Sequence, residues 1–234
     1  MRRFAFIFAR GGSKGLKEKN IKIFLDQPLI TYSIKQAINC KMFEKVFVST
    51  DNAKIANISL LDGAEVIDRP FKLAQDNSPE WLAWQHAISY AEKKYGIFDQ
   101  FVSLPPTSPL RSNEDILNAC EMLEKTKDSN ACIAISPSSR NPYFNMVQRN
   151  KDNIIERVCK TDSNVTRRQD APSVFDITTA VYAVNVDFIK KSKDLFSGTV
   201  LSIEIPKERA VDIDDILDFE FAEFLYKNLY HDKR

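Results

Sequence analysis

A glycine-rich loop with several positive charges lies near the beginning of the chain. Residues 9–15 read Ala-Arg-Gly-Gly-Ser-Lys-Gly. The charged residues within and just after this loop are Arg10, Lys14, Lys17 and Lys19. Glycines allow tight turns and let backbone N–H groups approach a ligand, and such groups bind phosphate oxygens. The loop has neither the dinucleotide spacing G-x-G-x-x-G nor the P-loop order G-x-x-x-x-G-K-[ST]. We predict that it binds a polyphosphate; the alternative is a surface turn with solvated lysines.

Two aspartates separated by one residue occur late in the chain. Asp212 and Asp214 flank Ile213, and in an extended segment side chains two positions apart point to the same side. Two carboxylates on one side suit a hard divalent cation such as Mg²⁺. The next residue, Asp215, is placed to cap a following helix. We predict a magnesium site here; the alternative is that all three aspartates only cap that helix.

A pair of adjacent arginines forms the third candidate feature. Arg167 and Arg168 are followed by Gln169 and Asp170. Arginine binds carboxylates and phosphates with two parallel hydrogen bonds, so the pair suggests an anionic partner, whereas the alternative is a solvated turn held by Asp170. Together, a cationic loop, a cation site and a second anion site indicate an enzyme that acts on a nucleoside triphosphate.

The order of apolar segments indicates how these residues are positioned. The apolar strand 4–9 leads directly into the glycine loop, and open α/β sheets bind ligands at the carboxyl ends of their strands. Further strands are predicted at 45–49, 64–67, 98–104, 130–135, 179–184 and 200–205. Helices are predicted at 28–39, 53–61, from about 77–80, from 112 or 113 to about 125, and from about 215. This alternation predicts an α/β fold with a mostly parallel sheet flanked by helices.

The segment 137–175 departs from this alternation. It is polar, contains prolines and clustered arginines, and shows weak helix or strand periodicity. We predict a single domain over 1–234, with 137–175 as an inserted arm or dimerisation segment; the alternative is a disordered excursion. Its apolar residues, which argue against disorder, are Tyr143, Phe144, Val147, Ile154, Ile155 and Val158.

The overall composition excludes several classes of partner. Lys and Arg total 33 against 32 Asp and Glu, a net charge of +1, and they are spread along the chain. A basic excess or basic patch is the usual sign of nucleic-acid or membrane-surface binding. The apolar start is too short for a secretory leader, and no apolar segment approaches membrane-spanning length. We therefore expect neither nucleic-acid nor membrane partners.

Cysteines and histidines limit the chemistry further. The four cysteines are far apart with no C-x-x-C spacing, which favours reduced thiols in a cytoplasmic protein over disulfides. Only His86 and His231 are present, so a His-rich metal centre is excluded. We expect His86 to be a structural helix residue and His231 to lie in the C-terminal tail.

The ordered set of motifs resembles the acylneuraminate cytidylyltransferases, also called CMP-sialic acid synthetases. The matching motifs are 9–15 with Lys19-Asn20, Ser49-Thr50-Asp51, Arg69-Pro70, 106–111, Arg168-Gln169-x-x-Pro172 and 212–214. The resemblance spans nearly the whole chain. It implies a Rossmann-like nucleotidyltransferase fold and a homodimer in which an arm reaches across. It also implies that CTP and a nonulosonic acid, a nine-carbon 2-keto sugar acid, give a CMP-sugar and pyrophosphate.

The resemblance also implies roles for individual residues. The residues that would bind the triphosphate are Arg10, Gly11, Gly12, Ser13, Lys14 and Lys19. Arg10 and Lys14 would neutralise charge during the reaction. Asn20 and Arg69 would help to bind the cytidine, and Asp212 and Asp214 would bind Mg²⁺ as catalytic residues. Arg168 would pair with the carboxylate of the sugar acid, and Gln169 would contact the same substrate.

The chain departs from the sialic acid enzymes around the expected sugar site. Pro105 stands where they commonly carry Gln, and Asp176 and Thr178 stand where they carry a cation and an amide. Because these changes alter the hydrogen-bonding groups near the sugar, Asp176 and Thr178 are candidate sugar-binding residues. Together with the segment 140–145, they favour a bacterial sialic acid analogue such as legionaminic acid.

Other functions remain compatible with the same residues. A cytidylyltransferase for another sugar acid, such as an octulosonate, or a nucleotidyltransferase for a sugar phosphate would use the same loop and aspartates. A non-catalytic nucleotide-binding or scaffolding protein would need the loop but not the aspartate pair. The motifs do not identify the general base that takes the proton of the sugar hydroxyl. The candidates are the sugar's own groups, a metal-bound hydroxide and the aspartates.

Overall fold

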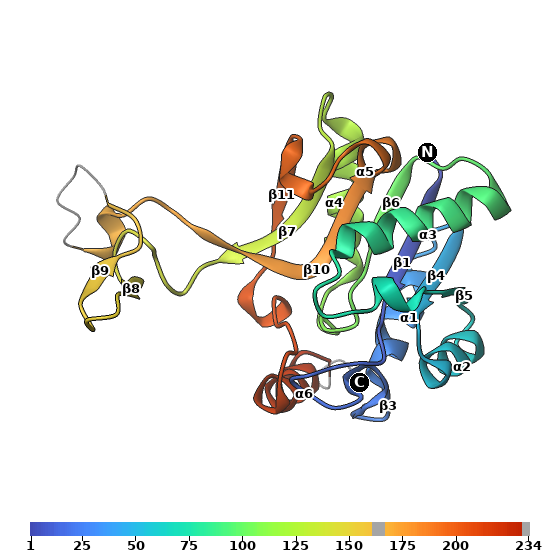
Figure 1. Ribbon diagram of the computed structural model, residues 1–234, viewed down its shortest axis with the longest axis horizontal. Helices are drawn as coiled ribbons and strands as arrows, with labels where there is room; N and C mark the ends of the chain where they lie inside the picture. The colour runs from blue at the N-terminus through green and yellow to red at the C-terminus, as the bar shows by residue number, and fades with distance from the viewer. Residues whose placement is uncertain (161–166, 231–234) are drawn as a thin grey trace.

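The structure is a computed structural model that describes residues 1–160 and 167–230. A seven-stranded sheet lies at its centre, in the order β11-β7-β10-β6-β1-β4-β5 (Figure 1). The strands are β1 (Arg3–Phe8), β4 (Lys45–Thr50), β5 (Glu65–Asp68), β6 (Gln100–Ser103), β7 (Ala131–Pro137), β10 (Phe175–Asn185) and β11 (Val200–Glu204). Strand β10 runs antiparallel to both its neighbours, and the other pairs are parallel. The predicted mostly parallel sheet is confirmed.

Helices cover both faces of the sheet. They are α1 (Leu29–Asn39), α2 (Ala53–Leu61), α3 (Glu80–Tyr95), α4 (Asn113–Lys125), α5 (Val186–Lys191) and α6 (Ile216–Tyr230). Alternation along β1 places Ala5 and Ile7 in the core under α1, α2 and α4, and Phe4 and Phe6 in the core under α3 and α5. Because both faces are buried, the central strand has no polar side. This arrangement explains why residues 4–9 form one continuous apolar run.

The starts of the helices follow from their capping residues. At α4 the Ser112 side chain accepts from the Asp115 N–H while Asp115 accepts from the Ser112 N–H, a capping box. At α3, whose start the sequence placed at about 77–80, Pro79 occupies the cap position and no side chain caps the helix.

The carboxyl ends of four parallel strands meet at one edge of the sheet. The glycine loop follows β1, and Asp51 follows β4. Arg69 follows β5, and the turn 105–111 follows β6. A third apolar cluster packs α6 against the short hairpin of β2 (Ile23–Phe24) and β3 (Gln27–Pro28), and it includes Ile213. The segment 211–214 is thereby held at the same edge.

An arm projects from the body of the molecule (Figure 1). Strand β10 begins four residues before the predicted start at Thr179 and, with β7, leads out to the arm. There β8 (Val147–Arg149) and β9 (Ile155–Arg157) form an antiparallel hairpin that the weak periodicity of 137–175 did not predict. The reason is that each strand has three residues, all exposed, so no alternation of buried and exposed positions exists to be detected.

Candidate active site

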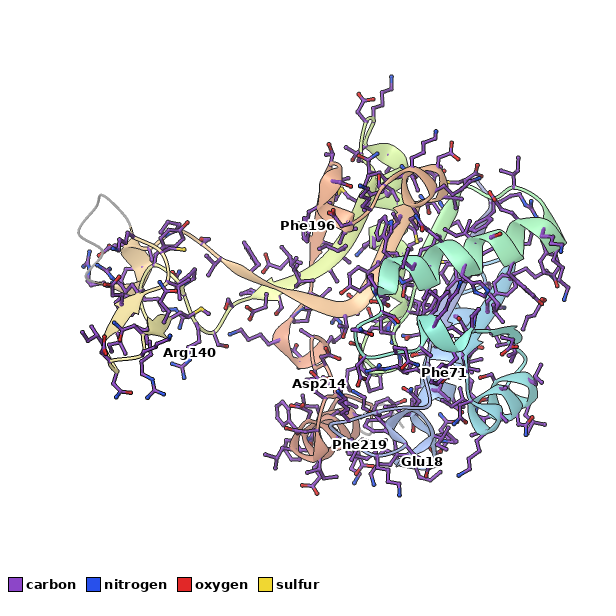
Figure 2. All side chains as sticks on the ribbon, in the orientation of Figure 1. Glu18, Phe71, Arg140, Phe196, Asp214 and Phe219 are labelled. Carbon is purple, nitrogen blue, oxygen red and sulfur yellow. The ribbon has the colours of Figure 1, made fainter. Side chains whose placement is uncertain are left out.

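A cavity of about 510 Å³ opens at the edge where the strands end. Its lining residues are Phe8, Arg10, Ser13, Lys14, Gly15, Lys19, Asn20, Glu80, Pro105, Pro106, Thr107, Thr179, Tyr182 and Asp214. The cavity therefore joins the glycine loop to one member of the late aspartate pair, although about 200 positions separate them in sequence. Five of the loop's predicted ligand-binding side chains face it. Figure 2 shows Asp214 beside α6, whereas Arg140 lies out on the arm.

The glycine loop and the aspartate segment touch directly. Lys19 is largely buried, its Nζ donates to the Ile213 carbonyl, and it lies 3.3 Å from Asp214 Oδ1. A Cβ atom on Gly15 would lie 2.2 Å from the Asp214 carbonyl oxygen. No side chain fits at that distance, so glycine at position 15 allows the two backbones to approach. Gly15 and Asp214 both line the cavity.

We expect Gly15→Ala to destabilise the protein. The new methyl group would overlap the Asp214 backbone, and forcing atoms into a packed contact costs about 1–3 kcal/mol. Gly12→Ala is the matched control, because a Cβ there meets no atom within 4 Å. Urea unfolding should show a lower free energy of unfolding for Gly15→Ala and a change within about 0.5 kcal/mol for Gly12→Ala. Equal stabilities would contradict the close approach.

Side chains within and beside the loop hold its shape. The Asn20 amide, which is buried, donates to the Arg10 carbonyl at 3.1 Å. The Gly11 N–H donates to Asp51 Oδ1 at 2.9 Å. Asn20, expected to contact the cytidine, thus also supports the loop backbone.

An unpredicted carboxylate pairs with both cations of the loop. Asp76 Oδ1 lies 2.7 Å from Arg10 Nη1, and its Oδ2 lies 2.5 Å from Lys14 Nζ. The hydrogen bond from Lys14, followed by that from Arg10, lowers the pKa of Asp76. No sequence pattern singles out Asp76, because its role depends on a contact across more than sixty positions.

Arg69 lies in an adjoining cavity of about 250 Å³ that shares Phe8, Arg10 and Glu80 with the first. Its Nη2 donates to the Ser49 carbonyl at 2.6 Å, and its guanidinium lies 5.3 Å from the centre of the Phe8 ring. Burial lowers the pKa of Arg69 to about 10, so the side chain is still charged at neutral pH. It is a buried cation in a fixed orientation beside the loop.

Glu80 and Tyr182 are further polar residues of the cavity that the sequence did not predict. Glu80 lines both cavities, and the Trp84 Nε1–H donates to its Oε1 at 3.2 Å. Loss of water around the carboxylate raises the pKa of Glu80, and the charge of Arg69 opposes this effect. Burial raises the pKa of Tyr182 to about 12. The sequence around Glu80 indicates only the start of a helix and gives no sign that this carboxylate lines a cavity.

The three late aspartates have different environments. Asp215 caps α6 by accepting from the Leu217 and Asp218 N–H groups at 2.8 and 3.0 Å. Asp214 is 80% exposed and faces the cavity. Asp212 carries a buried Oδ1 atom with no hydrogen-bond partner.

A buried carboxylate oxygen without a partner is costly unless an ion or a water satisfies it. The Asp212 oxygen therefore fits a hard cation. Asp214 offers an exposed carboxylate whose Oδ1 lies 3.3 Å from Lys19 Nζ, and it lines the cavity, which Asp212 does not. Within residues 1–160 and 167–230, no group of three or more His, Cys, Asp or Glu residues is arranged to hold a metal. A magnesium ion held by one or two carboxylates takes its other ligands from water and substrate phosphates, which agrees with this limited protein donor set.

Arg111 is a buried residue that supports the turn 105–111 next to the site. It is fully buried, its Nε donates to the Ser108 carbonyl at 2.9 Å, and its Nη2 donates to Ser33 Oγ at 2.9 Å. The Ile213 N–H donates to the Thr107 carbonyl at 2.9 Å, which ties this turn to the aspartate segment. Arg111 thus supports the backbone of the turn 105–111.

The predicted sugar-binding arginine lies elsewhere. Arg168 and Gln169 line a second cavity of about 540 Å³, together with Asn141, Phe175 and Glu204. Arg168 Nη2 donates to the Ser138 carbonyl at 2.9 Å. This cavity shares no lining residue with the nucleotide-side cavity. The alternative of a turn held by Asp170 applies to the neighbouring Arg167, which forms that ion pair at 2.9 Å.

The other two candidate sugar residues line neither of these two cavities. Thr178 is buried and donates its hydroxyl to the Ala134 carbonyl at 3.0 Å. Its role in sugar binding stays a prediction. Asp176 is exposed on β10, paired in register with Ser136 of β7. His86 lies within α3 as predicted, and His231 lies outside the described residues.

Comparison with known proteins decides the family. A family model described as Cytidylyltransferase matches residues 4–197. The chain belongs to the cytidylyltransferase family. It is therefore a nucleotidyltransferase, in agreement with the resemblance found in its motifs.

Two relatives at 35% identity match over nearly their full length. The chain is 35% identical to the post-translational flagellin modification protein B of Campylobacter coli, covering 94% of this chain and 93% of that protein. It is 35% identical to the CMP-N,N'-diacetyllegionaminic acid synthase of Campylobacter jejuni, covering 95% of each. The N-acylneuraminate cytidylyltransferase of Escherichia coli is 31% identical, and the match covers 93% of this chain but 50% of that protein.

A solved structure has the same fold. A CMP:2-keto-3-deoxy-manno-octonic acid synthetase complexed with CTP superimposes with a TM-score of 0.71. The match covers 98% of this chain and 100% of that chain at 14% sequence identity. The Rossmann-like nucleotidyltransferase fold is thereby confirmed. No helix in the described part of the chain is both long and apolar enough to cross a membrane.

Proposed function

We propose that the enzyme transfers CMP from CTP to a nonulosonic acid, a sialic acid or a bacterial analogue such as legionaminic acid, with release of pyrophosphate. The supporting observation is the single cavity lined by both Lys14 and Asp214. The relatives that match along nearly their full length include a CMP-N,N'-diacetyllegionaminic acid synthase at 35% identity and a pseudaminic acid cytidylyltransferase at 32%, which favours a nonulosonic acid over an octulosonate. The octonic acid synthetase shares the fold at 14% identity, which carries no argument about the sugar.

The chain's own residues would bind and orient the triphosphate. Arg10, Lys14 and Lys19 would supply positive charge, and the loop N–H groups and Ser13 would donate hydrogen bonds to phosphate oxygens. The anomeric hydroxyl of the sugar acid attacks the α-phosphorus, its oxygen forms the new bond, and its proton is released to solvent. The bond from that phosphorus to the oxygen bridging the α- and β-phosphates breaks, and pyrophosphate leaves. Arg10 and Lys14 would stabilise the charge that develops on pyrophosphate as it leaves.

A divalent cation completes the proposed site. Asp212 and Asp214 would hold Mg²⁺, because one has a buried oxygen without a partner and the other faces the cavity. When bound, Mg²⁺ neutralises charge on the triphosphate. Lys19, which contacts Ile213 and Asp214, keeps the aspartate segment against the loop.

The nucleoside would lie towards the adjoining cavity. Arg69 presents a charged, desolvated guanidinium there, within the same wall as Phe8 and Arg10. Its bonds to Ser49 fix its orientation, so it can donate to a carbonyl of the base without reorganising. Asn20 lines the nucleotide-side cavity and would contribute to the same recognition.

We infer that the sugar acid binds in the second cavity and that the enzyme acts as a homodimer. The supporting observation is that Arg168 and Gln169, on the arm, line the second cavity and do not line the nucleotide-side cavity of the same chain. The arm also exposes apolar side chains of Met146, Val147, Ile154, Ile155, Val158, Phe175 and Ile177. An exposed apolar surface of this kind marks a protein interface. We infer that the arms of two copies pack together and that Arg168 meets the carboxylate of the sugar acid in the assembled dimer.

The cysteines are compatible with a cytoplasmic enzyme. Cys40, Cys120, Cys132 and Cys159 are all free. Burial raises the pKa of Cys120 and Cys132, which keeps these thiols protonated. A reducing compartment preserves such thiols, and we propose the cytoplasm as the location.

A substrate panel tests the function. The pure enzyme is incubated with CTP, Mg²⁺ and one of legionaminic, sialic, pseudaminic or octulosonic acid, and the products are identified by mass spectrometry. We expect a CMP-sugar and pyrophosphate with a nonulosonic acid, most rapidly with legionaminic acid. A reaction without acid is the control. Folded protein that binds CTP but activates none of the nonulosonic acids would contradict the proposal, and preference for octulosonic acid would support the alternative.

A further inference from the structure

One carboxylate bridges the two cations of the phosphate loop. Asp76 contacts Arg10 at 2.7 Å through Oδ1 and Lys14 at 2.5 Å through Oδ2. Each oxygen serves one cation, as two oxygens of a phosphate group would. The carboxylate therefore occupies the place of an anionic ligand with respect to these two side chains.

The bridge is exposed and so is easily exchanged. The side chains of Asp76 and Lys14 are 47% and 78% exposed, and that of Arg10 is 34% exposed. Ion pairs in contact with water contribute little net stability because water competes for both partners. A triphosphate carries several charged oxygens and can replace one carboxylate at both cations. The ion pairs of Asp76 with Arg10 and Lys14 must nevertheless be broken first, and this makes the free energy of triphosphate binding less favourable.

Asp76 lies on a segment that is separate from the loop. It follows the short helix η2 (Phe71–Leu73) and precedes α3. The Ser78 hydroxyl donates to the Lys72 carbonyl at 2.6 Å, and the Ser78 N–H donates to the Gln75 carbonyl at 3.1 Å. These bonds form a local turn that presents Asp76 to the loop. Because the neighbouring cations lower the pKa of Asp76, it stays ionised and competes at neutral pH.

We propose that Asp76 is a built-in counter-anion that sets the affinity of the phosphate loop. Without nucleotide it holds Arg10 and Lys14 in position, and with nucleotide it gives both cations up to the triphosphate. The same competition displaces pyrophosphate after the reaction. This inference rests on the proposed function in one respect, that the loop binds polyphosphate. Asp76 is thus a positioning residue that trades ground-state affinity for faster release of product.

Replacement by asparagine tests the competition. Asp76→Asn keeps the size of the side chain and removes its charge. We expect it to bind CTP and inorganic pyrophosphate about three- to tenfold more tightly, because two weak ion pairs no longer oppose binding. Calorimetry gives the dissociation constants, and stopped-flow chase gives a slower release of pyrophosphate. Asp76→Glu should restore most of the original affinity.

Glu18→Gln is the matched control. Glu18 lies near the same loop, and its loss changes the net charge equally, but it pairs with Lys54 at 2.8 Å. We expect its dissociation constants to stay within about twofold of the original, since exposed pairs act over short range in salt. Equal tightening by both variants would show a general charge effect and would overturn the inference.

The pyrophosphate affinities of the variants, compared with the activity of the original enzyme, test this inference and the proposed function separately. Weaker or unchanged pyrophosphate binding by Asp76→Asn would overturn the counter-anion role. Tighter pyrophosphate binding, without CMP transfer from CTP to any sugar acid by the original enzyme, would support the counter-anion and contradict the proposed reaction. Absence of pyrophosphate binding in every variant would overturn both.

Discussion

Lys14→Ala should lower kcat/KM for CTP by about two to three orders of magnitude, the usual effect of removing one preorganised charge contact to a transition state. Lys14 lines the nucleotide-side cavity, and its side chain is 78% exposed, so phosphate oxygens can reach it in exchange for Asp76. It contributes little to packing, and we expect the unfolding temperature to be unchanged. Steady-state pyrophosphate release measures the effect.

The control for this variant is Lys17→Ala. Lys17 lies in the same stretch of chain and is exposed, but it does not line the cavity. Its replacement removes the same charge, so an equal loss of activity in both variants would indicate long-range electrostatics rather than contact. A near-normal rate for Lys14→Ala would show that the loop lysine has a different role.

Asp214→Ala should reduce turnover by three orders of magnitude or more. Loss of a carboxylate that holds a catalytic cation removes several kcal/mol of charge stabilisation, and each 1.36 kcal/mol corresponds to a factor of ten in rate. Asp214 is 80% exposed, so the fold should be preserved. The measurement is pyrophosphate release over a range of Mg²⁺ concentrations. Turnover unchanged even at limiting Mg²⁺ would contradict the assignment.

A second measurement distinguishes cation binding from a purely structural role. With CTP present, Mg²⁺ should raise the unfolding temperature of the original protein and have a smaller effect on Asp214→Ala, because ligand binding stabilises the folded state by mass action. Asp187→Ala is the control, since this exposed aspartate lies on α5 and forms an ion pair with Lys191. It should retain full activity and the full Mg²⁺ effect.

Local sequence patterns were sufficient for the sheet and for much of the site. Residues 4–9 predicted β1 because a strand buried on both faces has no polar alternation, and the glycines that follow mark where the backbone turns. Ser112 predicted the start of α4 because its cap involves residues three positions apart. The order of strands and helices then placed the phosphate loop at the carboxyl edge. Each of these features depends on neighbours in the chain, so the sequence determines it.

Only the tertiary structure decided which distant groups meet. The contact between Gly15 and Asp214, the bridge of Asp76 to Arg10 and Lys14, and the position of Glu80 between two cavities join residues from separate elements. The tertiary structure also decided where Thr178 points: its position on β10 directs its hydroxyl to the Ala134 carbonyl. The antiparallel direction of β10 and the pairing of β8 with β9 in the arm likewise depend on hydrogen bonds between strands. Local propensity carries no information about such partners; packing of the whole chain selects them.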